Sequence, residues 1–142
     1  MNIDALVAFY ERLQPEDIGR FGEFYAPDAR FVDPFNDVVG VEAIAAIFRH
    51  MFEHLGAPRF VVTERFVASE QAVLVWTLHC RIGQRSIAIE GASHLHWGSD
   101  GRVSCHRDFW DAARGVYEHL PALGFVIRAL RRRMSASVPR AV

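Results

Sequence analysis

Residues 72–110 decide the fold, and they read AVLVWTLHCRIGQRSIAIEGASHLHWGSDGRVSCHRDFW. The stretch contains three extended runs rich in Val, Ile, Trp and Leu, which is typical of β-strands. We expect these strands over Ala72–Ile82, Ile87–Trp97 and Val103–Trp110. The glycine-containing segments between them, 83–85 and 98–101, are typical of tight hairpin turns. The stretch therefore predicts an antiparallel meander.

The chain before this meander follows a helical period instead. We expect helices over Ile3–Leu13, Ile18–Tyr25 and Val41–Leu55, where apolar side chains recur at helical spacing. The second helix should stop near Pro27, and Arg30–Pro34 reads as extended because a residue before proline is kept out of the α region. One more strand is expected at Phe60–Val67. Helices followed by a meander indicate an α+β domain, with the helices on one face of an antiparallel sheet.

Composition narrows the class of protein. The 142 residues are 51% hydrophobic and carry a net charge of −1, so a nucleic-acid partner is not expected. Two distant cysteines, Cys80 and Cys105, lack metal spacing and fit a reduced, cytoplasmic protein. The N-terminus has no basic segment followed by an apolar run, and no stretch approaches the roughly 20 apolar residues of a membrane span. We expect a cytoplasmic protein that uses no cofactor.

The C-terminal part is expected to be a helical tail on a single domain of 1–142 whose core spans about 3–112. The tail covers 112–134 with a break around Pro121 and Gly124, and residues 135–142 should be disordered. Its arginines are Arg128, Arg131, Arg132 and Arg133, and they lie beside apolar residues. The expected arrangement packs this helix on its own domain with the arginines in water. The alternative is contact between a basic amphipathic helix and an anionic membrane surface.

The last strand offers the most informative pattern for function. Its period of two places Ser104, His106, Asp108 and Trp110 on one face. Because an unpaired buried carboxylate costs several kcal/mol, this row would be a poor plain core but a suitable pocket wall, where His106 and Asp108 exchange protons with a ligand. The alternative buries Val103, Cys105 and Phe109 and leaves the row in solvent. Periodicity alone leaves both open.

Asp33 is the second candidate for proton transfer. In the turn-forming run Asp33-Pro34-Phe35-Asn36-Asp37 a carboxylate often caps local backbone N–H groups, which is the alternative to catalysis. The histidine pairs His94/His96 and His50/His54 lack a third ligand or an intervening glutamate, so no metal site is expected. No phosphate-binding glycine loop and no nucleophile elbow occur in the sequence.

Taken in their order along the chain, a set of residues resembles that of the SnoaL-like branch of the nuclear transport factor 2-like superfamily, which includes ketosteroid isomerases and polyketide cyclases. The resemblance covers about residues 5–112. Its anchors are Leu13, Asp17 and Ile18, the run Phe24–Pro34, Gly40 with the following helix, and the ending Asp100–Asp111. The resemblance implies a cone-shaped, strongly bent sheet with helices on its concave face, a deep apolar pocket, and a homodimer formed through the outer sheet face. The fold by itself does not specify a reaction.

By position, the resemblance implies roles for three residues. Asp33 falls where ketosteroid isomerases keep a general base, and Asp108 falls where similar polyketide cyclases keep an acid/base aspartate, with His106 beside it. The pocket is expected to be lined by Phe9, Tyr10, Phe35, Phe52, Trp76, Ser93, Trp97 and Trp110. Two carboxylates in one cavity would have pKa values driven apart, which predicts a bell-shaped pH–rate profile.

Departures from the family pattern bear on the reaction. The position of the oxyanion-hole tyrosine holds Phe9, although Tyr10 is adjacent, and the position of the second aspartate holds Ser93, a weaker donor than a carboxylic acid. A related hydrolase branch opens epoxides with an Asp–Arg–Asp set, and this sequence offers no clear arginine for the pocket. The sequence thus predicts isomerisation, cyclisation or dehydration of a small apolar molecule by Asp33, His106 and Asp108. The alternative is a non-catalytic small-molecule-binding protein of the same fold.

Overall fold

A computed structural model of the chain describes residues 1–115 and 123–134. Its contacts divide the chain into two units, 1–110 and 111–142. The helices of the first unit are α1 (Ile3–Arg12), the 3-10 helix η1 (Pro15–Glu23) and α2 (Val41–His54). Its strands are β1 (Tyr25–Val32), β2 (Asp37–Val39), β3 (Gly56–Val67), β4 (Gln71–Ile82), β5 (Arg85–Trp97) and β6 (Val103–Trp110).

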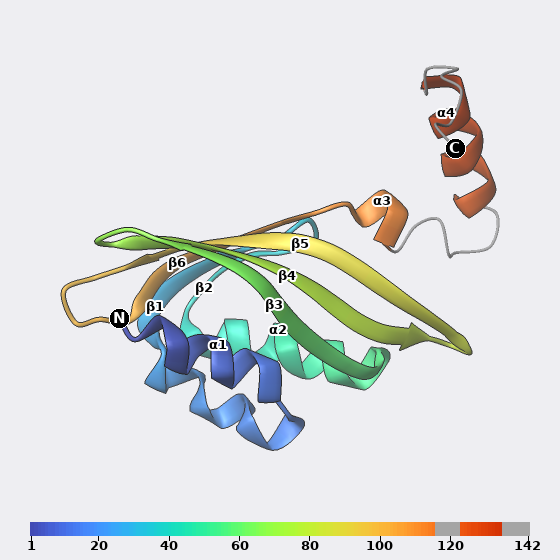
Figure 1. The fold of residues 1–142 in the computed structure, drawn as a ribbon. Helices are drawn as coiled ribbons and strands as arrows, with labels where there is room; N and C mark the ends of the chain where they lie inside the picture. Colours follow the sequence, from blue (N-terminus) through green and yellow to red (C-terminus); the bar gives the residue numbers. More distant parts are fainter. Residues whose placement is uncertain (116–122, 135–142) are drawn as a thin grey trace. The chain divides into compact units, whose positions relative to one another are not determined.

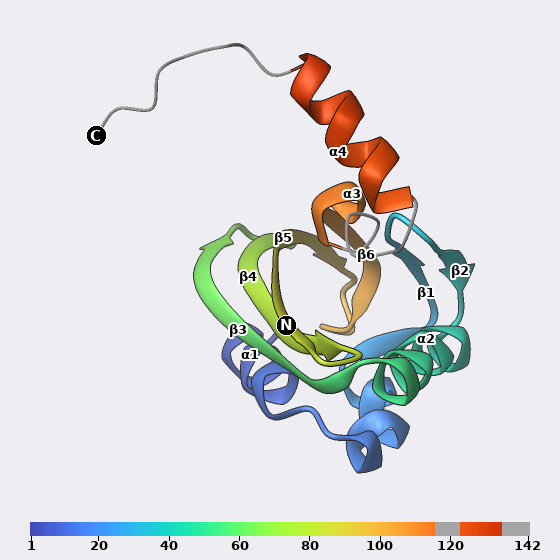
Figure 2. The same ribbon diagram turned by 90° about the vertical axis from the view of Figure 1, so that its right-hand side faces the viewer.

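The six strands form one bent sheet in the order β2-β1-β6-β5-β4-β3. All neighbours pair antiparallel except β1 and β6, which run parallel. The helices α1, η1 and α2 lie together on the concave side of this sheet (Figures 1 and 2). The α+β class, the mainly antiparallel bent sheet and the helices on its concave face are therefore confirmed.

Tyr25 lies in a strand, not in the helix that the sequence predicts. The 3-10 helix ends at Glu23, and Tyr25 is already the first residue of β1. Pro27 is accepted inside this strand because the ladder to β6 is irregular between Tyr25 and Arg30, so its missing N–H interrupts no regular pairing. Strand β2 was not expected, because three residues are too few to show a period.

The concave side is largely filled by apolar side chains. The largest fully buried ones are Tyr25, Phe21, Phe31, Leu6, Ile44, Leu95 and Val103. Phe21 packs its ring against Phe9 and Phe48, with centroids 5.4 and 4.8 Å apart. Such aromatic pairs each contribute about 0.5–1.5 kcal/mol beyond their buried area. The core therefore leaves little open space under the sheet.

The second unit contains two helices in its described part, α3 (Ala112–Gly115) and α4 (Leu123–Met134). Helix α4 includes Gly124, whereas the break expected at Pro121 and the disorder expected at 135–142 fall outside the described residues. Large apolar side chains on α4 are exposed, among them Phe125, Leu130 and Met134. Within the described part of the chain, no helix has the length and apolar character that crossing a membrane requires.

Candidate active site

The two residues singled out on β6 face the concave side. His106 lies opposite Leu95 of β5 and is 3% exposed, and Asp108 lies opposite Ser93 with a side chain that is 14% exposed. His106 Nε2 lies 2.7 Å from Asp108 Oδ1. The structure thus places His106 and Asp108 under the sheet and leaves Phe109 exposed. At the start of β6 the pattern is reversed, with Val103 buried and Ser104 exposed, where the pairing with β5 is irregular.

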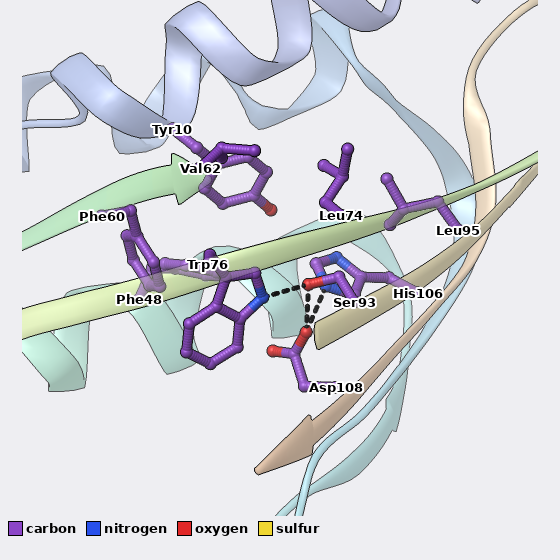
Figure 3. A pocket seen from close by; sticks show the side chains of 10 residues that line it. All are labelled: Tyr10, Phe48, Phe60, Val62, Leu74, Trp76, Ser93, Leu95, His106 and Asp108. Carbon is purple, nitrogen blue, oxygen red and sulfur yellow. Dashed lines mark hydrogen bonds and ion pairs between the residues drawn. The ribbon is translucent and has the colours of Figure 1, made fainter. Parts of the chain in front are cut away.

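One branch of hydrogen bonds reaches Asp108 from β4 and β5. The indole Nε1–H of Trp76 donates to Ser93 Oγ at 2.8 Å, and the Ser93 hydroxyl donates to Asp108 Oδ1 at 2.5 Å (Figure 3). Ser93 is only 5% exposed, and these two bonds satisfy its hydroxyl both as acceptor and as donor. Trp76 therefore acts on Asp108 through Ser93.

A second branch reaches Asp108 through His106. The Tyr25 hydroxyl lies 2.5 Å from His106 Nδ1, and the Tyr10 hydroxyl is hydrogen-bonded to that of Tyr25. If Nε2–H donates to Asp108, Nδ1 accepts the Tyr25 proton and Tyr25 accepts the Tyr10 proton, so every donor has an acceptor. The opposite order would leave the Tyr10 proton without an acceptor among the described residues. We assign the first order, with the Nε2–H tautomer.

Burial keeps both tyrosines protonated. It raises the pKa of Tyr10 far above its ordinary value, although the hydrogen bond with Tyr25 opposes this shift. Burial also raises the pKa of Tyr25 well above 10, and the neighbouring Tyr10 and the charge of Asp108 add to the effect. The pair therefore donates hydrogen bonds at any physiological pH.

Both branches meet at one carboxylate oxygen. Asp108 Oδ1 accepts from Ser93 and from His106, whereas Oδ2 has no hydrogen bond with the residues that the structure describes. Figure 3 shows the second oxygen turned away from both donors. Oδ1 is thus held in place, and Oδ2 is the atom open to a further partner.

A narrow apolar cavity adjoins this carboxylate. Its walls are Tyr10, Phe48, Phe60, Val62, Leu74, Trp76, Ser93, Leu95, His106 and Asp108 (Figure 3). The cavity volume is about 20 Å³, which is room for about one water molecule. A larger ligand can enter only if side chains of the wall move.

The wall formed by Trp76 depends on a glycine. Gly91 lies opposite Trp76 across β4 and β5, and a Cβ atom there would lie 2.4, 2.6 and 2.9 Å from three atoms of the indole ring. No side chain other than hydrogen fits under the ring as it stands. The absence of a side chain at position 91 therefore lets Trp76 reach Ser93.

Comparison with known proteins identifies the family. The model of the SnoaL-like domain matches residues 6–106. The chain belongs to the SnoaL-like domain family. No protein of curated function matches this SnoaL-like chain.

Three solved structures show the same fold as this SnoaL-like domain. An epoxide hydrolase from M. tuberculosis is 21% identical, with a TM-score of 0.67 over 91% of this chain and 95% of its own. A predicted SnoaL-like polyketide cyclase from Jannaschia is 17% identical, with a TM-score of 0.70 over 80% and 87%. A protein from Catenulispora acidiphila, in complex with trimethylamine, is 15% identical with a TM-score of 0.68 over 80% and 88%. At these identities the likeness shows the fold.

The SnoaL-like domain brings five of the predicted site residues to the cavity. These are Tyr10, Trp76, Ser93, His106 and Asp108. Five predicted wall residues are not among those that line it, namely Phe9, Phe35, Phe52, Trp97 and Trp110. Phe9 packs on Phe21 and Phe24 in the core, because the helical turn that aims Tyr10 at the sheet rotates its neighbour away. Phe35 and Trp110 contact each other, with ring centroids 5.3 Å apart.

Asp33 occupies a turn just after the end of β1. Its Oδ1 accepts from the backbone N–H of Phe35 at 2.7 Å and of Asn36 at 2.6 Å, and the Asn36 amide adds a bond at 3.0 Å. It is not one of the residues lining the cavity. This geometry favours the turn interpretation, since the carboxylate already satisfies local N–H groups. A role in proton transfer for Asp33 stays a prediction.

Sequence reasoning missed several members of the site. Tyr25 was assigned to a helix, and only its position in β1, next to β6, places its hydroxyl on His106. The remaining wall residues that were missed are Phe48, Phe60, Val62, Leu74 and Leu95. Their apolar positions were visible in the pattern, but apolar residues of a core and of a cavity look the same in sequence. Among the described residues no group of three or more His, Cys, Asp or Glu could hold a metal ion.

Proposed function

We propose that this SnoaL-like domain binds a small apolar molecule in the cavity and catalyses proton transfer on it, with Asp108 as the acid–base group. The observation that carries the proposal is the convergence of two buried hydrogen-bond branches on Asp108 Oδ1, which leaves Oδ2 beside apolar walls. A carboxylate held in this way is oriented before the substrate arrives, which is what proton transfer requires. Isomerisation, cyclisation and dehydration all need such a group.

The roles of the neighbours follow from their contacts. His106 fixes the Asp108 carboxylate through Nε2 and is itself fixed by Tyr25 through Nδ1. Ser93 supplies the second bond to Oδ1, and Trp76 orients Ser93. In the forward step a substrate C–H proton moves to Oδ2 while the carbonyl compound becomes an enolate, and the same proton returns from Oδ2 at another carbon or at an oxygen. The cavity walls contribute no arginine, so an Asp–Arg–Asp mechanism for epoxide opening lacks its central residue.

The four aromatic walls indicate the shape of the substrate. Tyr10, Phe48, Phe60 and Trp76 all line the cavity, and the rings of Phe60 and Trp76 meet edge to face with centroids 5.6 Å apart. Planar unsaturated compounds fit between such rings better than bulky saturated ones. A small cyclic enone or its β,γ-unsaturated isomer is the substrate class that these walls favour.

The test is exchange of substrate protons with solvent. A panel of cyclic β,γ- and α,β-unsaturated ketones is incubated in D₂O, and deuterium at the carbon next to the carbonyl is followed by NMR. The wild type should accelerate exchange of at least one compound, and Asp108→Asn should slow it by about 10²–10⁴-fold. Asp33→Asn tests the predicted proton-transfer role of Asp33: a loss as large as that of Asp108→Asn would support the role, and activity near that of the wild type would support the turn interpretation.

Two results would count against this function. Equal exchange by the wild type and Asp108→Asn would remove the proton-transfer role. Saturable binding of a ketone, observed without any exchange, would support the non-catalytic binding protein instead. Homodimer formation is a separate prediction from the family resemblance, and sedimentation of the purified protein tests it.

A further inference from the structure

Helix α4 carries a continuous row of apolar side chains along one side. This apolar stripe consists of Val126, Ile127, Leu130 and Met134. Residues at these spacings lie above one another on one face of an α-helix. Val126, Leu130 and Met134 are each more than half exposed. An exposed apolar surface of this kind marks a face that binds another surface.

The arginines of α4 surround the apolar stripe. They are Arg128, Arg131, Arg132 and Arg133. Helical geometry places Arg131 and Arg133 along the two edges of the stripe and the other two arginines on the opposite side. Residues 123–134 contain no acidic residue, whereas residues 1–110 contain ten arginines and fifteen acidic residues. A concentrated positive charge is therefore combined with the apolar stripe on one helix.

The length of α4 suits a position along a membrane surface. Its 12 residues rise about 18 Å, which is less than the roughly 30 Å of hydrocarbon that a spanning helix crosses. Amphipathic helices rich in arginine lie in the plane of the membrane, with the apolar face at the boundary between headgroups and acyl chains. Their arginines extend to the lipid phosphates while the aliphatic part of each side chain stays in contact with the apolar layer.

Charge and apolar stripe together select this occupant over two others. A nucleic acid would use the arginines for its phosphates but would leave the apolar stripe in water. A second α4, paired stripe to stripe, would bring the arginines at positions 131 and 133 of both copies together, and α4 contains no acidic residue to pair with them. Only an anionic lipid surface satisfies both sides of the helix.

We propose that α4 binds the surface of a membrane containing anionic phospholipids, with the apolar stripe facing the acyl chains. Each arginine near such a surface strengthens binding about fivefold. Helix α4 shares no residue with the cavity walls, so this attachment does not depend on the proposed proton transfer.

Flotation of the full chain with lipid vesicles tests the role of charge. The protein should float with equimolar phosphatidylcholine and phosphatidylglycerol, and it should stay behind with phosphatidylcholine alone. The double variant Arg132→Gln/Arg133→Gln should weaken binding about 25-fold, because two charges near the surface are lost. Its control is Arg12→Gln/Arg49→Gln, which removes the same charge from exposed positions of α1 and α2 and should leave binding unchanged. Equal weakening by both double variants would overturn the proposal.

Substitutions on two sides of α4 test its orientation on the vesicle. Leu130→Gln removes an apolar group from the stripe and should weaken binding about tenfold. Phe125→Gln is the matched control, since Phe125 is exposed but lies on the side opposite the stripe. It should change the affinity less than about twofold. Equal losses in the two variants would contradict a helix that lies with the stripe in the membrane.

Three further outcomes separate this inference from the alternatives. Absence of flotation, together with a loss of stability in urea for Leu130→Gln, would mean that the apolar stripe packs on the protein itself. Binding of duplex DNA without flotation would assign the arginines to a nucleic acid. Both results would overturn the proposal. Asp108→Asn should float as the wild type does, so an absence of proton transfer leaves the membrane attachment supported.

Discussion

His106 Nε2 and Asp108 Oδ1 lie 2.7 Å apart although both residues belong to the same strand, two positions from each other. Side chains at such positions share a face, and here the imidazole leans along β6 to reach the carboxylate. Because one strand carries both groups, their relation does not change when the cavity walls on β3, β4 or α2 move to admit a ligand. The walls can adapt while the proton-handling pair keeps its geometry.

Removal of the Tyr25 hydroxyl should destabilise the protein more than removal of the Tyr10 hydroxyl. In Tyr25→Phe both His106 Nδ1 and the Tyr10 hydroxyl lose their partner while buried, at a cost of about 1–3 kcal/mol. In Tyr10→Phe the Tyr25 proton still reaches His106, so the loss should be about 1 kcal/mol or less. Urea unfolding of the two variants measures the difference. An equal free energy of unfolding for both would contradict the order assigned to these donors.

A methyl group at position 91 should disturb the Trp76 branch. Gly91→Ala places Cβ within 3 Å of the indole, so the ring must shift and its bond to Ser93 is strained or lost. We expect a destabilisation of about 1–3 kcal/mol together with altered tryptophan fluorescence. Gly22→Ala is the matched control, because nothing lies within 4 Å of a Cβ there and its backbone has no positive φ. If Gly91→Ala matched the control in unfolding and in emission, the close contact of Gly91 with the Trp76 ring would be contradicted.

Stability should fall as the solution becomes alkaline. The unfolded chain ionises its tyrosines near pH 10, whereas burial raises the pKa of Tyr10 and Tyr25 in the native state. Above about pH 10 the unfolded state therefore holds fewer protons, and the stability present below that pH is progressively lost. Burial of the Cys80 thiol, whose pKa is also raised, acts in the same direction. Urea unfolding from about pH 8 to about pH 11 should show a steep loss that becomes shallower in Tyr25→Phe, and an identical slope would refute this origin.

The elements were largely predictable from the sequence, since periods of two and of 3.6 residues survive in long segments such as β4, β5, β6 and α2. The start of β1 and the whole of β2 were not predictable. Tyr25 lies next to a 3-10 helix whose period resembles that of an α-helix, so the sequence pattern places the start of β1 in a helix. Strand β2, Asp37–Val39, is too short to show any period.

The candidate site was predictable only where one strand determines it. His106 and Asp108 share a face because of local geometry, whereas the contact of Tyr25 with His106 depends on the parallel pairing of β1 and β6, which joins residues 81 positions apart. The choice between Phe9 and Tyr10 as the wall residue depends on the rotation of α1. The volume of the cavity depends on how Phe48, Phe60 and Trp76 pack together, and no pattern in the sequence reports that.

The protonation of His106 tests the central claim most directly. Nitrogen chemical shifts of the ¹⁵N-labelled histidines, with His106→Asn used to assign the signal, show which ring nitrogen carries the proton. The two branches meeting at Asp108 predict a proton on Nε2 that exchanges slowly with water, and a bare Nδ1 that accepts from Tyr25. A proton on Nδ1 with a bare Nε2, or a ring proton that exchanges as in a solvent-exposed histidine, would mean that Asp108 is not held as described.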